Sequence, residues 1–197
     1  MFHLVFATNN QHKIDEMQVA IGNLIQIITL TEAGINIDIP EPFATLEENA
    51  RIKSKTIHEL CGMDCFSEDT GLEVIALNGE PGVLSARYAG EHKNHHDNID
   101  KLLRKMKGIR DRRARFRTVL SLIWKNSEYT FEGICEGIIA TETKGDGGFG
   151  YDPVFIPTGS KLTFAEMDLQ QKNTFSHRKK AADRLVLFLQ TSIHQTS

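Results

Sequence analysis

The chain has 197 residues, of which 23 are lysine or arginine and 26 are aspartate or glutamate, so its formal charge is −3. With 40% hydrophobic and 25% charged residues, the composition excludes a disordered chain and a strongly basic nucleic-acid coat. No apolar run approaches the roughly 18 residues of a membrane span, and the apolar segment 4–7 lacks the length and the basic flank of a signal peptide. We therefore expect a cytoplasmic protein with no membrane partner.

The predicted elements follow from apolar periodicity and from punctuation by helix caps, glycine and proline. Thr45 and Glu48 fit a capping box, and Pro40 and Pro42 impose an extended link before it. In chain order we expect a strand over 4–7, a helix over 11–21, strands over 25–30 and 35–39, a helix from 45 to about 60, strands over 64–68 and 72–77 flanking a turn at 69–71, a helix over 94–106, a hairpin of strands over 116–125 and 129–141, a short strand over 154–156 and a helix from 176 to about 193.

This irregular alternation predicts an α/β fold in which helices cover the faces of a mixed sheet. No internal repeat, low-complexity tract or linker divides the sequence, so we expect one domain over residues 1–197. Cys61, Cys65 and Cys135 are odd in number and lack CxxC spacing, which speaks against a disulfide framework and against a structural zinc site.

The first candidate site follows the first predicted strand and opens the first predicted helix. Backbone N–H groups at the start of a helix, together with the helix dipole, favour a bound anion. A lysine in this first turn opposes the dipole unless an anion lies beside it, although a solvated N-cap turn is the simpler interpretation. The segment is Thr8-Asn9-Asn10-Gln11-His12-Lys13.

The next two candidate features are a lysine on a predicted helix and, separately, a group of carboxylates. Lys53 lies within the apolar stripe of its predicted helix, so it either extends to solvent or meets a negative partner such as phosphate. Glu68 and Asp69 are neighbours at a strand end and therefore point to opposite faces, which predicts different roles for them. With Glu41 on its stiff segment, they suit Mg²⁺, which needs one or two protein carboxylates plus substrate phosphates. The alternative is an ordinary turn.

Two further segments favour ligand binding over plain surface. The glycine-rich run 145–153 contains Phe149 and Tyr151, whose rings can stack on a base while glycines let the backbone approach closely. The run 176–180 places basic side chains in the first turn of the last helix, against its dipole, unless an oxyanion or a base edge faces them. By contrast, the basic stretch 104–117 predicts a solvated face or dimer rim rather than a nucleic-acid groove, and the histidines at 92, 95 and 96 lack paired acidic ligands.

Together these segments resemble the inosine triphosphate pyrophosphatase family over nearly the whole chain. Asn9 stands where the family usually has glycine, and Glu68 where many bacterial members have aspartate. Each motif is weak alone, but seven in order are specific. They are Thr8-x-Asn10-x-x-Lys13, Glu48-Asn49-Ala50-x-x-Lys53, Glu68-Asp69-Thr70-Gly71-Leu72, Pro81-Gly82-x-x-Ser85-Ala86-Arg87-Tyr88, Gly147-Gly148-Phe149-Gly150-Tyr151-Asp152-Pro153, Ala165-Glu166-Met167 and Ser176-His177-Arg178.

The resemblance implies an elongated α/β fold with two lobes around a substrate cleft, usually as a homodimer, and no nucleic-acid partner. It also implies Mg²⁺-dependent hydrolysis of noncanonical purine nucleoside triphosphates (ITP, dITP, XTP) to the monophosphate and pyrophosphate. Asp69 would be the proton acceptor and, with Glu41, would hold Mg²⁺. The implied substrate-binding residues are Thr8, Asn9, Asn10, Gln11, His12, Lys13, Lys53, Thr70, Phe149, Gly150, Tyr151, Asp152, Lys172, His177 and Arg178.

Two other functions remain open on the sequence. A related septum-inhibitor-like pyrophosphatase would act on pyrimidine or modified nucleotides. A nucleotide- or RNA-binding module without turnover would use the basic stretch 104–117 and the aromatic loop.

Overall fold

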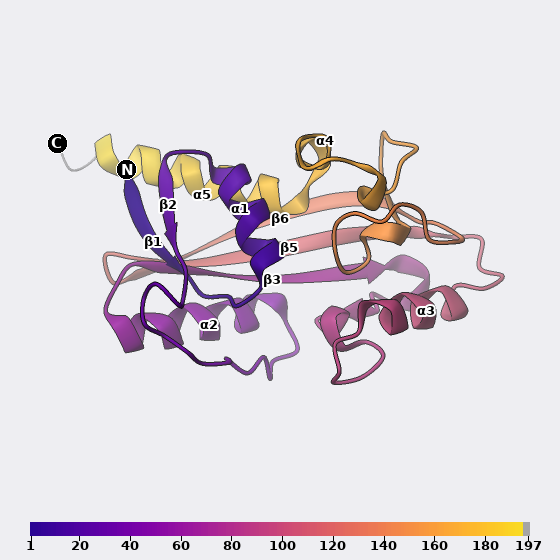
Figure 1. Ribbon diagram of the computed structural model, residues 1–197, viewed down its shortest axis with the longest axis horizontal. Coiled ribbons are helices and arrows are strands. Elements are labelled where there is room, and N and C mark those ends of the chain that lie inside the picture. The colour runs from indigo at the N-terminus through magenta and orange to yellow at the C-terminus, as the bar shows by residue number, and fades with distance from the viewer. Residues whose placement is uncertain (195–197) are drawn as a thin grey trace. The chain divides into compact units, whose positions relative to one another are not determined.

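The computed structural model describes residues 1–194, which form an α/β fold of seven strands and five α-helices (Figure 1). The strands are β1 (Phe2–Phe6), β2 (Ile25–Ile28), β3 (Cys65–Val74), β4 (Pro81–Gly82), β5 (Arg113–Trp124), β6 (Ser127–Ile139) and β7 (Phe155–Pro157). The helices are α1 (Gln11–Ile21), α2 (Leu46–Cys61), α3 (His95–Lys105), α4 (Leu169–Phe175) and α5 (His177–His194), with short 3-10 turns at Ile75–Leu77, Ser85–Arg87, Asp152–Val154 and Phe164–Glu166. Across these residues, no helix combines the length and hydropathy needed to span a bilayer.

The sheet is mixed, as the sequence predicts. Its strand order is β2-β1-β3-β5-β6-β7, and β4 pairs with β3 outside this order. β1 runs parallel to β2 and to β3, whereas β3–β4 and β6–β7 are antiparallel. Lys125 and Asn126 both have positive φ and form the two-residue turn between β5 and β6, the backbone geometry that suits a tight hairpin.

The chain divides into two compact units. Among the described residues, unit 1 comprises Met1–Asp69, Thr118–Gly133 and residues 178–194, and unit 2 comprises Thr70–Arg117 and Ile134–His177. Strands β3, β5 and β6 contribute residues to both units. The sequence prediction of a single domain over the whole chain stays a prediction.

Unit 1 packs helices on both faces of its strands (Figure 1). Leu4 and Phe6 of β1 face α1 and α5, where Met17 and Leu185 belong to the same buried cluster. Val5 of β1 faces the other way and shares a buried cluster with Ile57 of α2. This alternation is the two-residue period of a strand covered on both sides.

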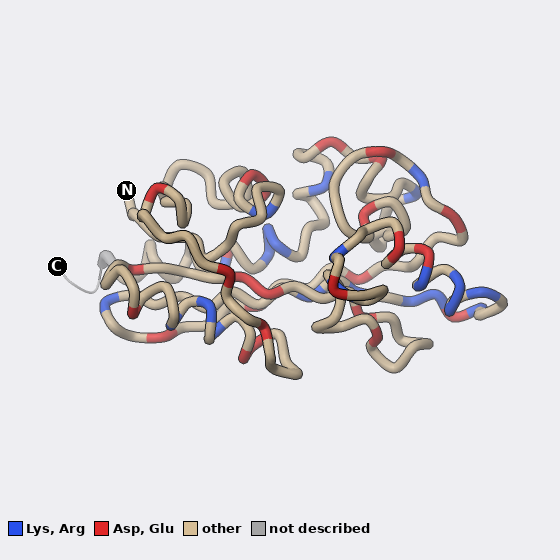
Figure 2. Tube along the Cα trace, turned by 60° about the horizontal axis from the view of Figure 1, so that its bottom comes forward, with Lys and Arg blue, Asp and Glu red and all other residues tan. Residues whose placement is uncertain are grey.

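Unit 2 has a separate core. Leu102 and Met106 from α3 and the residue after it pack with Phe116 of β5 and with Phe155 and Phe164, and all five are buried. The aromatic rings contact one another directly, with the centroids of Phe116 and Phe155 4.7 Å apart. Figure 2 shows lysines and arginines along the segment that joins α3 to β5, where the predicted basic stretch lies.

Two local predictions are wrong, and one helix was not predicted. Residues 35–39 form no strand. Their alternating isoleucines pack against the core, but the segment does not pair with the sheet. Residues 69–71 form no turn, since β3 continues to Val74. At Gly71 an added Cβ would lie 2.7 Å from the carbonyl oxygen of Gly82, so this glycine permits close strand pairing rather than a turn. Helix α4 was missed, although Asp168 and Gln171 form a capping box at its start.

Candidate active site

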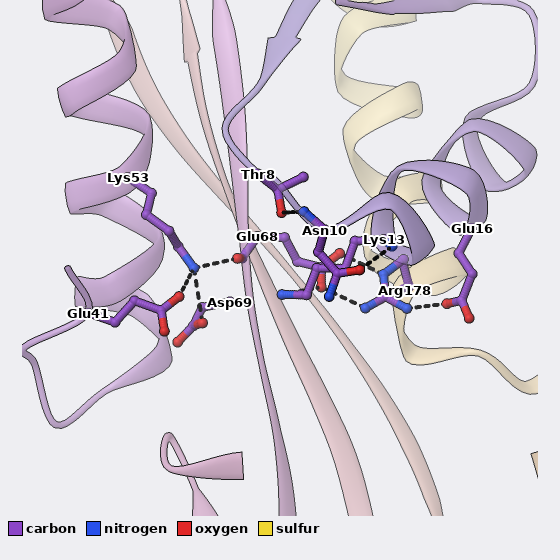
Figure 3. A network of polar contacts seen from close by, with 9 residues as sticks. All are labelled: Thr8, Asn10, Lys13, Glu16, Glu41, Lys53, Glu68, Asp69 and Arg178. Carbon is purple, nitrogen blue, oxygen red and sulfur yellow. Dashed lines mark hydrogen bonds and ion pairs between the residues drawn. The ribbon is translucent and has the colours of Figure 1, made fainter. Parts of the chain in front are cut away.

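The loop after β1 is held as a preformed start of α1 (Figure 3). Thr8 Oγ1 accepts a hydrogen bond from the Asn10 amide at 3.2 Å, and Asn10 Oδ1 caps the helix by accepting from the Lys13 amide at 3.3 Å. Asn9 lies outside the left-handed backbone region and donates its side-chain amide to Ile37 O at 2.9 Å. The loop therefore needs no glycine at Asn9, and the start of α1 carries Lys13 directed at β3.

Of the two alternatives for Lys53, solvent or a negative partner, the structure shows negative partners. Its Nζ lies 2.5 Å from Glu41 Oε1, 3.1 Å from Asp69 Oδ1 and 2.7 Å from the carbonyl oxygen of Glu68. Burial alone would lower the pKa of Lys53, but Asp69 and Glu41 raise it above its ordinary value. The ammonium is therefore charged and fixed between two carboxylates.

The neighbouring carboxylates of β3 point to opposite faces, as strand alternation predicts, and there they have different partners. Asp69 faces Lys53 and Glu41, whereas Glu68 turns to the other side of the strand. There Glu68 accepts two hydrogen bonds from the Arg178 guanidinium, at 2.6 and 2.7 Å, and lies 3.3 Å from Lys13 Nζ. Burial raises the pKa of Asp69, and Glu41 raises it further, although Lys53 opposes both effects.

Glu16 completes this network and was not found by sequence reasoning. It lies on α1, is only 7% exposed, and accepts a hydrogen bond from Arg178 Nη1. Burial lowers the pKa of Arg178, but Glu68 and Glu16 together raise it above its ordinary value. Its position in the helix could have indicated this. Glu16 lies four residues before Ala20, so both are on the buried face of α1, where a carboxylate needs a partner.

A second polar cluster forms within unit 2 around the glycine-rich loop. Asp152 Oδ2 accepts from the Phe149 amide at 2.9 Å and from Lys172 Nζ at 2.5 Å, and the Lys172–Asp152 pair is almost fully buried. Lys172 Nζ also lies 5.3 Å from the centroid of the Phe149 ring. At Gly148, which has φ of +71°, an added Cβ would lie 2.1 Å from Asp152 Oδ2. The loop is thus clamped around one buried carboxylate.

Other predicted residues of unit 2 are held by its core. The ring of His177 stacks on Phe116 with centroids 4.7 Å apart and an interplanar angle of 14°. Tyr151 donates its hydroxyl to Ser85 O at 3.0 Å, and burial raises the pKa of this phenol. Tyr151 therefore ties the glycine-rich loop to the residues that follow β4.

The structure places the predicted site residues in two groups. Unit 1 brings together Thr8, Asn10, Lys13, Glu41, Lys53, Asp69 and Arg178. Gln11 and His12 are exposed in the first turn of α1, and Gln11 donates to Asp15. Unit 2 holds Thr70, Phe149, Gly150, Tyr151, Asp152, Lys172 and His177. Arg178 was predicted to bind the nucleoside beside His177, but its guanidinium lies in the carboxylate network of unit 1; its role toward the nucleoside stays a prediction.

Glu41 and Asp69 have the chemistry to hold a divalent cation. One ammonium contacts both carboxylates, so oxygens from two separate elements converge on a single point. Within residues 1–194 no three His, Cys, Asp or Glu side chains form a complete metal cage. Mg²⁺ is usually bound by one or two carboxylates together with substrate phosphates, so this pair is sufficient.

Comparison with known proteins identifies the family. The Ham1 family model matches residues 4–188. The chain is 49% identical over 190 residues to a protein from Porphyromonas gingivalis named dITP/XTP pyrophosphatase, covering 96% of this chain and 98% of the relative. It is 50% identical to a protein of the same name from Flavobacterium johnsoniae, covering 93% and 95% of the two chains.

Solved structures agree with these sequence relatives. The Ham1 protein of Staphylococcus aureus superposes with a TM-score of 0.87 at 40% identity, covering 96% of this chain and 99% of that one. A HAM1 protein from Coxiella burnetii superposes with a TM-score of 0.88 at 37% identity, covering 97% and 100%. The resemblance inferred from seven short motifs is confirmed, and the chain belongs to the Ham1 family.

Proposed function

We propose that this protein hydrolyses noncanonical purine nucleoside triphosphates, namely ITP, dITP and XTP, to the monophosphate and pyrophosphate with Mg²⁺. The name that the relatives carry, dITP/XTP pyrophosphatase, supports the reaction and the substrate class. The observation that carries the proposal is Lys53, whose ammonium joins Glu41 and Asp69 at one point. The proposal assigns phosphate binding to Lys53 and metal binding to the two carboxylates that it contacts.

The residues of unit 1 supply what phosphoryl chemistry requires. The amides at the start of α1, with Lys13 and Lys53, bind the triphosphate. Asp69 and Glu41 hold the metal ion, and Asp69 accepts the proton of the attacking water, for which a raised pKa is suited. Bound Mg²⁺ supplies neutralisation of charge on the phosphates and on the leaving pyrophosphate.

In this proposal, residues of unit 2 and Arg178 of unit 1 recognise the nucleoside. Phe149 offers a ring for stacking, and its position is fixed by Asp152 and Lys172. His177 and Arg178 provide polar contacts to the base. Replacing the 6-amino group of adenine by a 6-oxo group exchanges a donor for an acceptor, and a donor such as Arg178 discriminates by that change.

A substrate panel tests the proposal. ITP, dITP, XTP, ATP, GTP, dTTP and UTP are incubated with and without Mg²⁺, and the nucleotide products are separated by chromatography. We expect the first three to give monophosphate and pyrophosphate only with Mg²⁺, and ATP and GTP to be poor substrates. Faster turnover of dTTP or UTP would instead indicate a pyrimidine-directed pyrophosphatase, and oligonucleotide binding without turnover would indicate a binding module.

Substitution of Asp69 tests its assigned role. We expect Asp69→Asn to lower kcat for ITP by about 10²- to 10⁴-fold, the usual contribution of a positioned general base. Glu59→Gln changes an exposed carboxylate of α2 and is the matched control, with unchanged kcat. Near-normal turnover by Asp69→Asn would show that another group accepts the proton.

The family resemblance also leads us to propose a cytoplasmic homodimer. Light scattering coupled to size exclusion measures the mass of the purified protein, and a value near twice 22.2 kDa is expected. Cell fractionation checks the location. A monomeric mass or a membrane-associated protein would contradict these two proposals.

A further inference from the structure

Lys53 occupies the point at which two proposed metal ligands converge. Its Nζ lies 2.5 Å from Glu41 and 3.1 Å from Asp69, and the side chains of Lys53 and Asp69 are each only 8% exposed. A divalent cation that uses both carboxylates has to occupy nearly the same space and satisfy the same negative charge. One buried ammonium and one metal ion are thus alternatives for a single pair of oxygens.

The net charge of the residues around Lys53 also favours an exchange of the ammonium for a metal ion. Figure 3 shows three cationic side chains, Lys13, Lys53 and Arg178, against four carboxylates. The carboxylates outnumber the cations by one, and each of the three cations has a carboxylate partner. The cluster therefore has no positive surplus to offer a polyanion, whereas a divalent cation added to it reverses its sign.

We propose that Lys53 competes with the divalent cation for Glu41 and Asp69 and transfers to the phosphates when nucleotide binds, so that metal and nucleotide bind cooperatively. This inference rests on the function proposed above and adds an order to it. Without nucleotide, the cation must displace a buried ammonium and binds weakly. With nucleotide, the phosphates accept the ammonium and both carboxylates become available to the metal.

Metal affinity without nucleotide tests the competition directly. Free Mn²⁺ is measured by electron paramagnetic resonance during titration of the wild type and of Lys53→Met and Lys53→Gln. We expect both variants to bind Mn²⁺ about tenfold more tightly or better, because one neighbouring charge shifts the proton affinity of a carboxylate by roughly 10- to 1000-fold. Lys55→Met, on the exposed side of the same helix, is the matched control and keeps the wild-type affinity.

The cooperative part is tested with a non-hydrolysable ITP analogue. In the wild type the analogue tightens Mn²⁺ binding strongly, and in the two Lys53 variants this enhancement is smaller. Equal or weaker Mn²⁺ affinity of the folded Lys53 variants without nucleotide would overturn the proposal, as would an unchanged enhancement. Mn²⁺ binding too weak to measure in the variants would overturn it as well, because removal of the ammonium should open the site.

A measurement on the wild type does not depend on the stability of any variant. Reductive methylation followed by mass spectrometry reports the reactivity of each lysine. We expect saturating Mg²⁺ to increase the methylation rate of Lys53 several-fold and to leave that of Lys55 unchanged. An unchanged or slower rate for Lys53 contradicts displacement. Failure of the proposed function appears separately, as absence of pyrophosphate release from ITP by the wild type or as Mn²⁺ binding that Glu41→Gln does not weaken.

Discussion

We expect the Glu68 carboxylate to contribute strongly to the stability of unit 1, and Glu68→Gln tests this. Its side chain is fully buried, accepts two hydrogen bonds from Arg178 and pairs with Lys13. Removing one charge of a buried pair costs about 3–5 kcal/mol. Because Arg178 keeps Glu16 and glutamine keeps one acceptor oxygen, we expect a loss of about 3 kcal/mol in the free energy of unfolding. Urea unfolding followed by the fluorescence of Trp124, the only tryptophan and part of unit 1, measures the loss.

Glu128→Gln is the control for this measurement. Glu128 also pairs with two cations, Arg51 at 2.8 Å and Lys55 at 3.4 Å, but the side chains of both cations are about half exposed. Exposed pairs of this kind contribute about 0–1 kcal/mol. If Glu68→Gln lowers the free energy of unfolding no more than Glu128→Gln does, the buried Glu68 carboxylate does not stabilise the fold as argued.

Three further predictions follow from backbone, burial and capping. Gly148→Ala forces Cβ against the carboxylate of Asp152, so we expect at least a tenfold higher KM for ITP, whereas Gly108→Ala, with similar φ in open space, should leave KM unchanged. Burial raises the pKa of the Cys65 thiol to about 12. The folded chain therefore keeps a proton that the unfolded chain loses, and the free energy of unfolding falls between about pH 9 and pH 12, by up to roughly 4 kcal/mol. Urea unfolding at pH 8 and at pH 11 measures this decline. The free energy of unfolding should fall less for Cys65→Ala than for the wild type, and an equal fall in both would contradict the assignment. Thr45→Ala removes the cap of α2 and should lower the free energy of unfolding by about 1 kcal/mol, whereas no change would show that the cap is dispensable.

Much of the site could be predicted because its residues violate ordinary patterns. A lysine in the apolar stripe of α2 had either to reach solvent or to meet a negative partner, and in the structure it meets Glu41 and Asp69. Alternation along β3 predicted opposite faces for Glu68 and Asp69, which is confirmed, whereas their different roles stay a prediction. Such conflicts are visible in a sequence because a charged residue at a position that the local pattern buries carries a free-energy cost unless it has a partner.

The remaining features depend on contacts that no local pattern encodes. The isoleucines of residues 35–39 alternate as in a strand, yet the segment has no place in the sheet. Gly71 resembles a turn former, but its lack of Cβ serves the close approach of Gly82. Glu16 becomes a site residue only through Arg178, which lies 162 residues away in the sequence. Tertiary contact decides each of these positions.

Phosphorus NMR of the reaction products of ITP tests the proposed reaction most directly. With Mg²⁺ we expect inosine monophosphate and pyrophosphate to appear in equal amounts, with no inosine diphosphate, and we expect neither product from Asp69→Asn on the same time scale. Inosine diphosphate with inorganic phosphate, or an unreacted triphosphate in the presence of Mg²⁺, would contradict it.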